Sequence, residues 1–143
     1  MKTQAFQPLA LMSIEVNSMT KTLDINGKIT ISIDPDSQEF ADRVFATLSV
    51  LDKQHQNLLN NRPVTNSLAY DIFSETNKDI RRQLDELLNS PVCDALFGKD
   101  AVCALSGGAP LWFNLMEGIV SQLSIPPTNS AKKIMESYAA NRR

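Results

Sequence analysis

The chain has 143 residues, a length that suits one folded domain with one hydrophobic core. Its content of 43% hydrophobic and 21% charged residues argues against a disordered or fibrous protein. The net charge is −2, but residues 128–143 carry +3, which leaves −5 for residues 1–127. Such an acidic body lacks the clustered lysine and arginine that nucleic-acid binding requires, so we expect no nucleic-acid partner.

The first part of the chain has the alternating pattern of a β-sheet. Polar and apolar residues alternate in residues 12–17 (MSIEVN) and again through residues 21–33. Asn26-Gly27 divides the second run, and this dipeptide between two alternating runs predicts a hairpin turn with positive φ at both positions. We therefore expect an N-terminal antiparallel hairpin or a three-stranded sheet, whose open edge is a candidate docking surface for a second copy or a partner strand.

Two long amphipathic helices are expected next, paired as an antiparallel helical hairpin. An Asx cap, a proline and acidic residues within residues 34–39 predict the start of the first helix, and its predicted end lies near residues 60–61, just before an Arg-Pro dipeptide. The second is expected over residues 67–88, although the polar run 74–77 weakens its middle. Apolar residues spaced three and four apart predict one core-facing stripe on each helix: Phe40, Val44, Leu48, Leu51, His55, Leu58 and Leu59 on the first, and Ala69, Ile72, Phe73, Ile80, Leu84, Leu87 and Leu88 on the second.

Glycine and proline predict shorter elements after these helices. A third helix is expected to begin at residues 90–91 and to end at Gly98, and a fourth is expected over residues 101–106. The glycines at 107–108 are interpreted as a turn that lets two short helices cross closely. The apolar stretch 110–123 predicts a largely buried helix.

The expected organisation is a single compact α+β domain over residues 1–127, with four to five helices after the sheet. Residues 128–143 form a basic C-terminal tail, flexible or helical, with few apolar residues to dock it. No apolar run reaches the roughly 20 residues of a membrane span, and no signal-peptide pattern or disulfide framework is recognised. We therefore expect a cytoplasmic protein with no membrane partner.

His55, Cys93 and Cys103 are the candidates for catalysis or metal binding. Two cysteines and one histidine do not supply four zinc ligands within one protomer, and both cysteines stand among small apolar residues, as buried cysteines do. The glycine-rich segment matches neither phosphate-binding motif, and no nucleophile motif accompanies the histidine. We expect no enzyme activity, no cofactor and no small-molecule substrate; an enzyme that gathers these three residues with distant carboxylates stays open.

The remaining signals concern partner proteins. Trp112 and Phe113 are adjacent, so on a helix they project about 100° apart and need not both reach the core. An exposed aromatic residue there would anchor another chain, and a wide buried face is the alternative. The predicted partner-binding residues are Leu111, Trp112, Phe113, Met116, Lys132 and Lys133.

The order of these features resembles that of small tail assembly chaperones of long-tailed phages and prophages of Gram-positive bacteria. The likeness is carried by the LDINGKITISID hairpin that leads into SQEFADRVFATL, by LDELLNSPVCDALFGKDAVCAL, and by the GGAPLWFNLMEGI helix before a basic tail. It covers roughly residues 20–143 as a layout. It implies a non-enzymatic protein that coats the helical tape measure protein, keeps it soluble and helps recruit tail tube protein, often as a homo-oligomer.

A different class of function is kept as an alternative: a phage or prophage inhibitor of a host defence or regulatory protein. The acidic body would suit that role by presenting carboxylates to a basic nucleic-acid channel. The two hypotheses differ in the partner. A chaperone should bind an apolar coiled segment and self-associate, whereas an inhibitor should form one stoichiometric complex.

Overall fold

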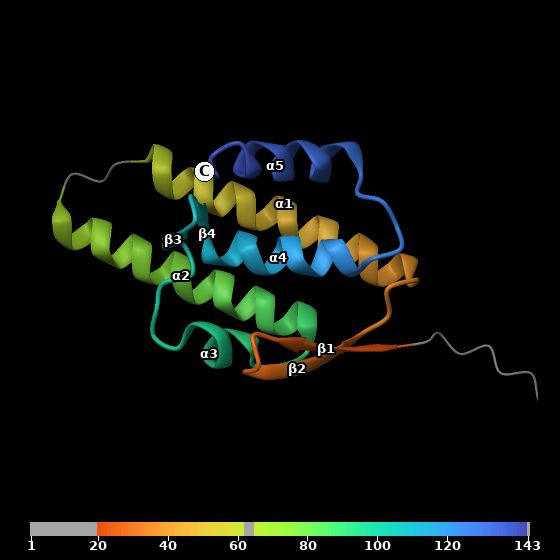
Figure 1. Ribbon diagram of the computed structural model, residues 1–143. Coiled ribbons are helices and arrows are strands. Elements are labelled where there is room, and N and C mark those ends of the chain that lie inside the picture. The colour runs from red at the N-terminus through yellow and green to blue at the C-terminus, as the bar shows by residue number, and fades with distance from the viewer. Residues whose placement is uncertain (1–19, 62–64, 143) are drawn as a thin grey trace, which may run out of the picture.

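The computed structural model describes residues 20–61 and 65–142 and shows an α+β fold (Figure 1). A two-stranded hairpin comes first, two long helices follow, and three shorter helices and a second small hairpin complete the chain. None of the helices in these described residues is long and apolar enough to cross a membrane. The elements are β1 (Lys21–Ile25), β2 (Ile29–Ile33), α1 (Gln38–Asn60), α2 (Asn66–Leu88), α3 (Val92–Phe97), β3 (Leu105–Ser106), β4 (Ala109–Pro110), α4 (Leu111–Gln122) and α5 (Asn129–Ala139).

The β1–β2 hairpin confirms the prediction made from the alternating pattern. Its turn has φ values of 55° at Asn26 and 68° at Gly27, the positive values that the dipeptide predicts. Ile31 and Ile33 are buried, and Thr30 and Ser32, which alternate with them, are exposed. The strand expected at residues 12–17 lies outside the described residues, within which this sheet has two strands.

Both long helices begin and end close to the predicted positions. The cap of α1 is Ser37 rather than the expected aspartate, and its hydroxyl accepts a hydrogen bond from an N–H of the first turn at 3.1 Å. Asp34 instead accepts the N–H of Asp36 in the turn before the helix. Thr65 caps α2 in the same way as Ser37, and the helix ends at Asn89 with a left-handed φ of 50°.

The apolar stripes of the two helices are buried over only part of their length. Buried residues run from 41 to 55 in α1 and from 80 to 88 in α2. Leu59, Ile72 and Phe73 were expected in the core but are exposed. The prediction was wrong at these three positions because the rest of the chain packs against one end of the helix pair and leaves the other end uncovered (Figure 1).

The segment after α2 contains the one element that differs in type from the prediction. Helix α3 ends at Gly98 as expected, but residues 101–106 form a turn and strand β3 instead of a helix. The glycines at 107–108, with φ values of 67° and 87°, make the turn between β3 and β4 and do not join two helices. The N–H of Val102 donates to the side chain of Asn77 on α2 at 2.8 Å, so α2 holds this segment in a non-helical path.

The C-terminal residues are part of the folded body. Helix α5 packs against α1, and its buried Tyr138 donates a hydroxyl hydrogen bond to Asp52 of α1 at 2.8 Å. Beyond the helix, Arg142 forms an ion pair with Glu117 of α4 and lies over the ring of Phe113. The basic segment expected to be flexible or helical is therefore helical and docked.

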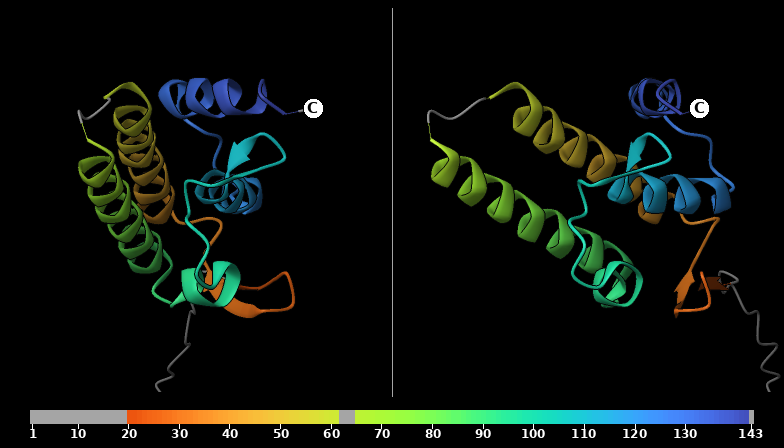
Figure 2. Two further views of the ribbon diagram at one scale, coloured as in Figure 1. Left: turned by 90° about the vertical axis from the view of Figure 1, so that its left-hand side faces the viewer. Right: turned by 60° about the vertical axis from the view of Figure 1, so that its left-hand side comes forward.

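The elements are arranged in two layers (Figure 2). α1 and α2 lie side by side and antiparallel, and form one layer. Across this pair lie α5, then α4, then α3 together with the β1–β2 hairpin. The end of α1 and the beginning of α2 project past this second layer, which places a pair of helical turns outside the packed body (Figure 1).

Candidate functional site

The aromatic residues predicted to bind a partner belong to the core. Trp112, Phe113 and Met116 are completely buried, and Leu111 is half-buried. Although Trp112 and Phe113 project in different directions from α4, both directions are covered, because α1 lies on one side of the helix and the end of α5 on another. The structure therefore shows the wide buried face that was the alternative. The prediction that Trp112 or Phe113 is an exposed anchor was wrong.

The two lysines of the predicted set lie elsewhere. Lys132 and Lys133 are exposed near the beginning of α5, and no ion pair to either is found within residues 20–61 and 65–142. The contacts between α5 and the aromatic residues of α4 come from Tyr138, almost two helical turns further along. The structure does not bring the six predicted residues together on one surface.

His55 is a packing residue at the centre of an aromatic cluster. It is 5% exposed, and its Nδ1 accepts a hydrogen bond from the indole Nε1–H of Trp112 at 3.4 Å. The rings of Trp112 and Tyr138 contact it edge-on, with centroids 5.8 and 5.9 Å away. Burial lowers the pKa of His55 below its usual 6.5, against the opposing effect of the nearby Asp52 carboxylate. A neutral, hydrogen-bonded histidine confirms the packing interpretation.

Both cysteines are buried free thiols. Burial raises the pKa of Cys93 to about 12 and that of Cys103 to about 11, so neither forms the thiolate that nucleophilic or metal chemistry requires at neutral pH. Among the residues that the structure describes, no three histidine, cysteine, aspartate or glutamate side chains are grouped to hold a metal ion. These residues support packing and not catalysis.

A surface suited to protein binding lies at the projecting end of the α1–α2 pair. Within the described part of the chain, all but two of the large exposed apolar side chains lie there, and Tyr70 is 71% exposed. No residue from 66 to 79 is buried, although this stretch carries four large apolar side chains. We call this surface the apolar tip; it consists of Leu59 of α1 and Leu68, Tyr70, Ile72 and Phe73 of α2.

The apolar tip is wider than one neighbouring helix can cover. Successive residues lie about 100° apart around a helix, so the apolar residues from Leu68 to Phe73 spread over an arc of about 200°. Asp71, Ser74 and Glu75 occupy the remaining polar arc. A helix that is apolar over more than half of its circumference needs neighbours on more than one side. Since α1 covers only one side, part of this apolar arc stays exposed.

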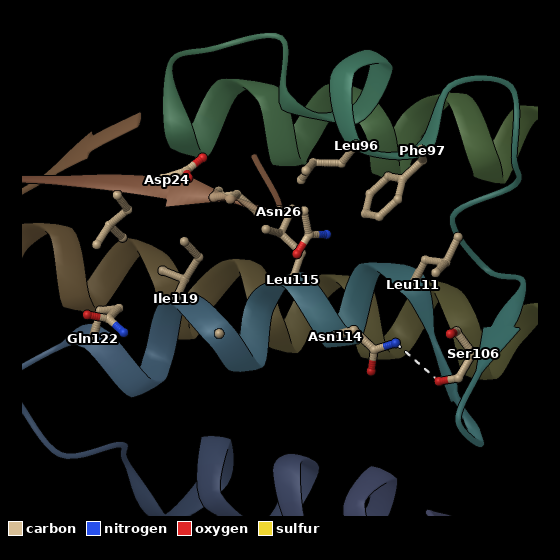
Figure 3. Close-up of a pocket in the computed structure, with 13 residues that line it drawn as sticks. Asp24, Asn26, Leu96, Phe97, Ser106, Leu111, Asn114, Leu115, Ile119 and Gln122 are labelled. Carbon is tan, nitrogen blue, oxygen red and sulfur yellow. Dashed lines mark hydrogen bonds between the residues drawn. The ribbon is translucent and has the colours of Figure 1, made fainter. Parts of the chain in front are cut away.

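A second candidate surface is a groove of about 450 Å³ between β1 and α4, which is also lined by Leu96 and Phe97 of α3 and Ser106 of β3 (Figure 3). Its floor is apolar and includes Leu115 and Ile119 of α4, while Asp24 is the one charged residue among those described that line it. Leu111 is the one predicted partner-binding residue that lines this groove. A largely apolar lining with a single carboxylate is typical of a binding surface.

Sequence reasoning missed both surfaces for different reasons. The tip residues Ile72 and Phe73 were assigned to the buried stripe, although the polar run 74–77 interrupts that stripe and marks where the core ends. The groove leaves no comparable signal, because it depends on how far β1 lies from α4. The sequence predicted only that the open edge of the sheet could be a docking surface, and this edge borders the groove.

Comparison with known proteins adds no family to these observations. No family model matches the chain, and no curated protein or solved structure matches it. The chain's own surfaces are therefore what points to its function.

Proposed function

We propose that this chain is a non-enzymatic tail assembly chaperone of a long-tailed phage or prophage of Gram-positive bacteria. In the host cytoplasm it binds the tape measure protein, keeps this protein soluble and aids assembly of the tail tube around it. The observation that carries the proposal is the apolar tip, because a chaperone must expose apolar surface that its client can cover.

The shape of the tip suits a helical client. Two antiparallel helices present a ridged surface, and a third helix packs into the groove between such ridges. From Leu68 to Glu75 the apolar arc of α2 carries no charged side chain, since Asp71 and Glu75 lie on the other side of the helix. The apolar stripe of a long amphipathic helix, as expected of a tape measure protein, would be buried there.

The proposal also predicts oligomerisation. A long helical client repeats its apolar stripe along its length, so several copies of this chain can bind one client molecule. Each copy would cover the stripe for a few turns, and neighbouring copies would be brought into contact with one another. A homo-oligomer is therefore expected on the client.

The test is co-expression with a tape measure protein, the one encoded downstream of this gene if there is one, followed by size-exclusion chromatography with light scattering. We expect a soluble complex with several copies of this chain per tape measure molecule. The double variant Tyr70→Ser, Phe73→Ser should leave the tape measure protein insoluble. Leu105→Ser is the matched control, because Leu105 is an equally exposed apolar residue on β3, outside the tip, at 67% exposure.

Two outcomes would contradict the proposal. A lone, monodisperse particle that leaves the tape measure protein insoluble would favour the alternative, an inhibitor with one defined host partner. Loss of the complex in Leu105→Ser and in the tip variant alike would show that the tip is not the binding surface.

A further inference from the structure

The groove between β1 and α4 runs along the edge of a strand. Four consecutive residues of the hairpin, 23–26, line it. Consecutive side chains of a strand point to opposite faces, so a groove lined by all of them borders the strand's edge rather than one of its faces. Within the described residues β1 pairs with β2 on one side only, which leaves its other edge without a strand neighbour.

The opposite wall of the groove is one face of α4. Its lining residues begin at Leu111, continue through Leu115 and Ile119, and end at Gln122, at the spacing of one helix face (Figure 3). This face is about 16 Å long, because each helical residue advances by about 1.5 Å. Three residues of β1, 23–25, line the groove and span about 10 Å, so β1 faces only part of this length. Leu96 and Phe97 of α3 and Ser106 of β3 also line the groove (Figure 3).

The edge of β1 favours an extended occupant. A strand alongside β1 supplies the hydrogen bonds that its edge lacks within the described residues, and a helix does not.

The lining also specifies the chemistry of the occupant. The floor, Leu115 and Ile119, is itself buried, and Leu96 and Phe97 of α3 add apolar lining beside it. Asp24 is the one carboxylate, and no lysine or arginine is among the described lining residues. Gly118 adds room on the α4 side, because nothing lies within 4 Å of the position where a Cβ would stand. These features favour a segment with apolar residues at alternate positions and a basic residue beside Asp24.

We propose that this groove binds an extended segment of a partner protein as a third strand on the free edge of β1. Every second side chain of the segment packs on α4, and a lysine or arginine of the segment faces Asp24. The site is distinct from the apolar tip, which is formed by other elements, and it goes beyond the proposed chaperone function. The groove would be a second binding surface of the chain. It would bind a strand, whereas the apolar tip is proposed to bind a helix.

The test uses the full chain, labelled with ¹⁵N, and a capped hexapeptide of alternating valine and threonine with a central lysine as the probe. We expect the peptide to shift amide resonances of residues 23–26 and of α4 in nuclear magnetic resonance spectra. A counterpart with N-methyl groups on the amides that would face β1 should bind at least about tenfold more weakly. Tyr70→Ser should bind the peptide as the wild type does, which separates this site from the tip.

A matched pair of variants tests the groove itself. Gly118→Leu places a side chain in the groove and should weaken peptide binding at least about tenfold. Gly118→Ala adds a single methyl group in open space and should keep the affinity within about twofold. Melting curves of both variants show whether they are folded, so a loss of binding in a folded Gly118→Leu protein supports the groove.

Three results would overturn the proposal. The first is no shift of these amides at a peptide concentration on the order of 1 mM. The second is equal binding of the N-methylated peptide or equal binding by Gly118→Leu. The third is a gain of peptide affinity in Ile14→Asp, which would show that the chain's own residues 12–17 compete for the edge and that no partner strand is required.

Discussion

The two ends of the α1–α2 pair carry similar apolar side chains but differ in what covers them. At one end, residues 80–88 of α2 contribute four buried side chains to the core; at the other, residues 66–79 contribute none. The physical reason is length. Each long helix has 23 residues and extends about 34 Å, whereas α4 has 12 and extends about 18 Å, so it cannot cover the whole pair. The spacing of apolar residues determines which side of a helix is hydrophobic. The lengths of the neighbouring elements determine how much of that side stays exposed to solvent.

The largest expected effect compares the same substitution at both ends of α2. Leu84→Ala should lower the free energy of unfolding by about 2–5 kcal/mol, because Leu84 is completely buried and its removal leaves a cavity. Leu68→Ala, at the exposed end, should change it by less than about 0.5 kcal/mol. Urea unfolding followed by circular dichroism measures both. Equal losses would contradict the division into a covered and an uncovered end.

A smaller effect is expected on acidification, at the boundary between the two ends, where His55 is buried. Burial lowers its pKa in the folded state, so below pH 6.5 the unfolded chain binds a proton more readily than the folded one. The stability contributed by neutral His55 is complete above pH 6.5 and is lost as the pH falls below that value towards the lowered pKa.

The measurement is a series of melting curves on either side of pH 6.5 for the wild type and for His55→Gln. The glutamine keeps an acceptor for the indole N–H of Trp112 but does not titrate. The carboxylates of the chain titrate in both proteins, so the difference between the two isolates the histidine. Identical pH dependence in both would show that His55 does not contribute.

Removing the aromatic residues of the tip should change stability little. In Tyr70→Ser, Phe73→Ser both side chains are exposed, so the free energy of unfolding should stay within about 1 kcal/mol of the wild type. Binding of the dye ANS, which reports exposed apolar surface, should fall clearly. Unchanged dye binding would place the accessible apolar surface elsewhere, and the groove would be the next candidate.

Thiol labelling compares the two ends without any change in stability. The high pKa values and burial of Cys93 and Cys103 should make both native thiols react slowly with a disulfide reagent near neutral pH. Tyr70→Cys should add one thiol that reacts at once, because that position is exposed. Rapid labelling of the two native cysteines would contradict the packing of the covered end.

Several local features could be predicted because neighbouring residues are enough to specify them. Asn26-Gly27 requires a turn with positive φ, and α3 ends at Gly98, as expected, with a positive φ of 55° that favours glycine. The helix expected over residues 101–106 failed for the opposite reason. Its short length gave few internal hydrogen bonds, and a contact with Asn77, about 25 residues earlier in the chain, decided its path.

The candidate site was predicted less well than the fold. Trp112 and Phe113 were chosen as partner anchors because large aromatic residues dominate interfaces, but the same property makes them the centre of this core. Phe73 was assigned to the core by its spacing, and it lies at the tip instead. The identity of a large aromatic residue suits it both to a core and to an interface. Only the position of the elements that cover it decides which of these it occupies.

The sequence by itself determined the hairpin, the two long helices, the buried helix α4 and the absence of any recognised catalytic motif, since these depend on spacing and turn chemistry within a few residues. Tertiary structure decided the rest: that α5 docks through Tyr138, that α4 is covered on both sides, and that the apolar tip and the groove stay open. Such outcomes depend on contacts between residues far apart in the chain and on the relative lengths of the elements, which no local pattern records.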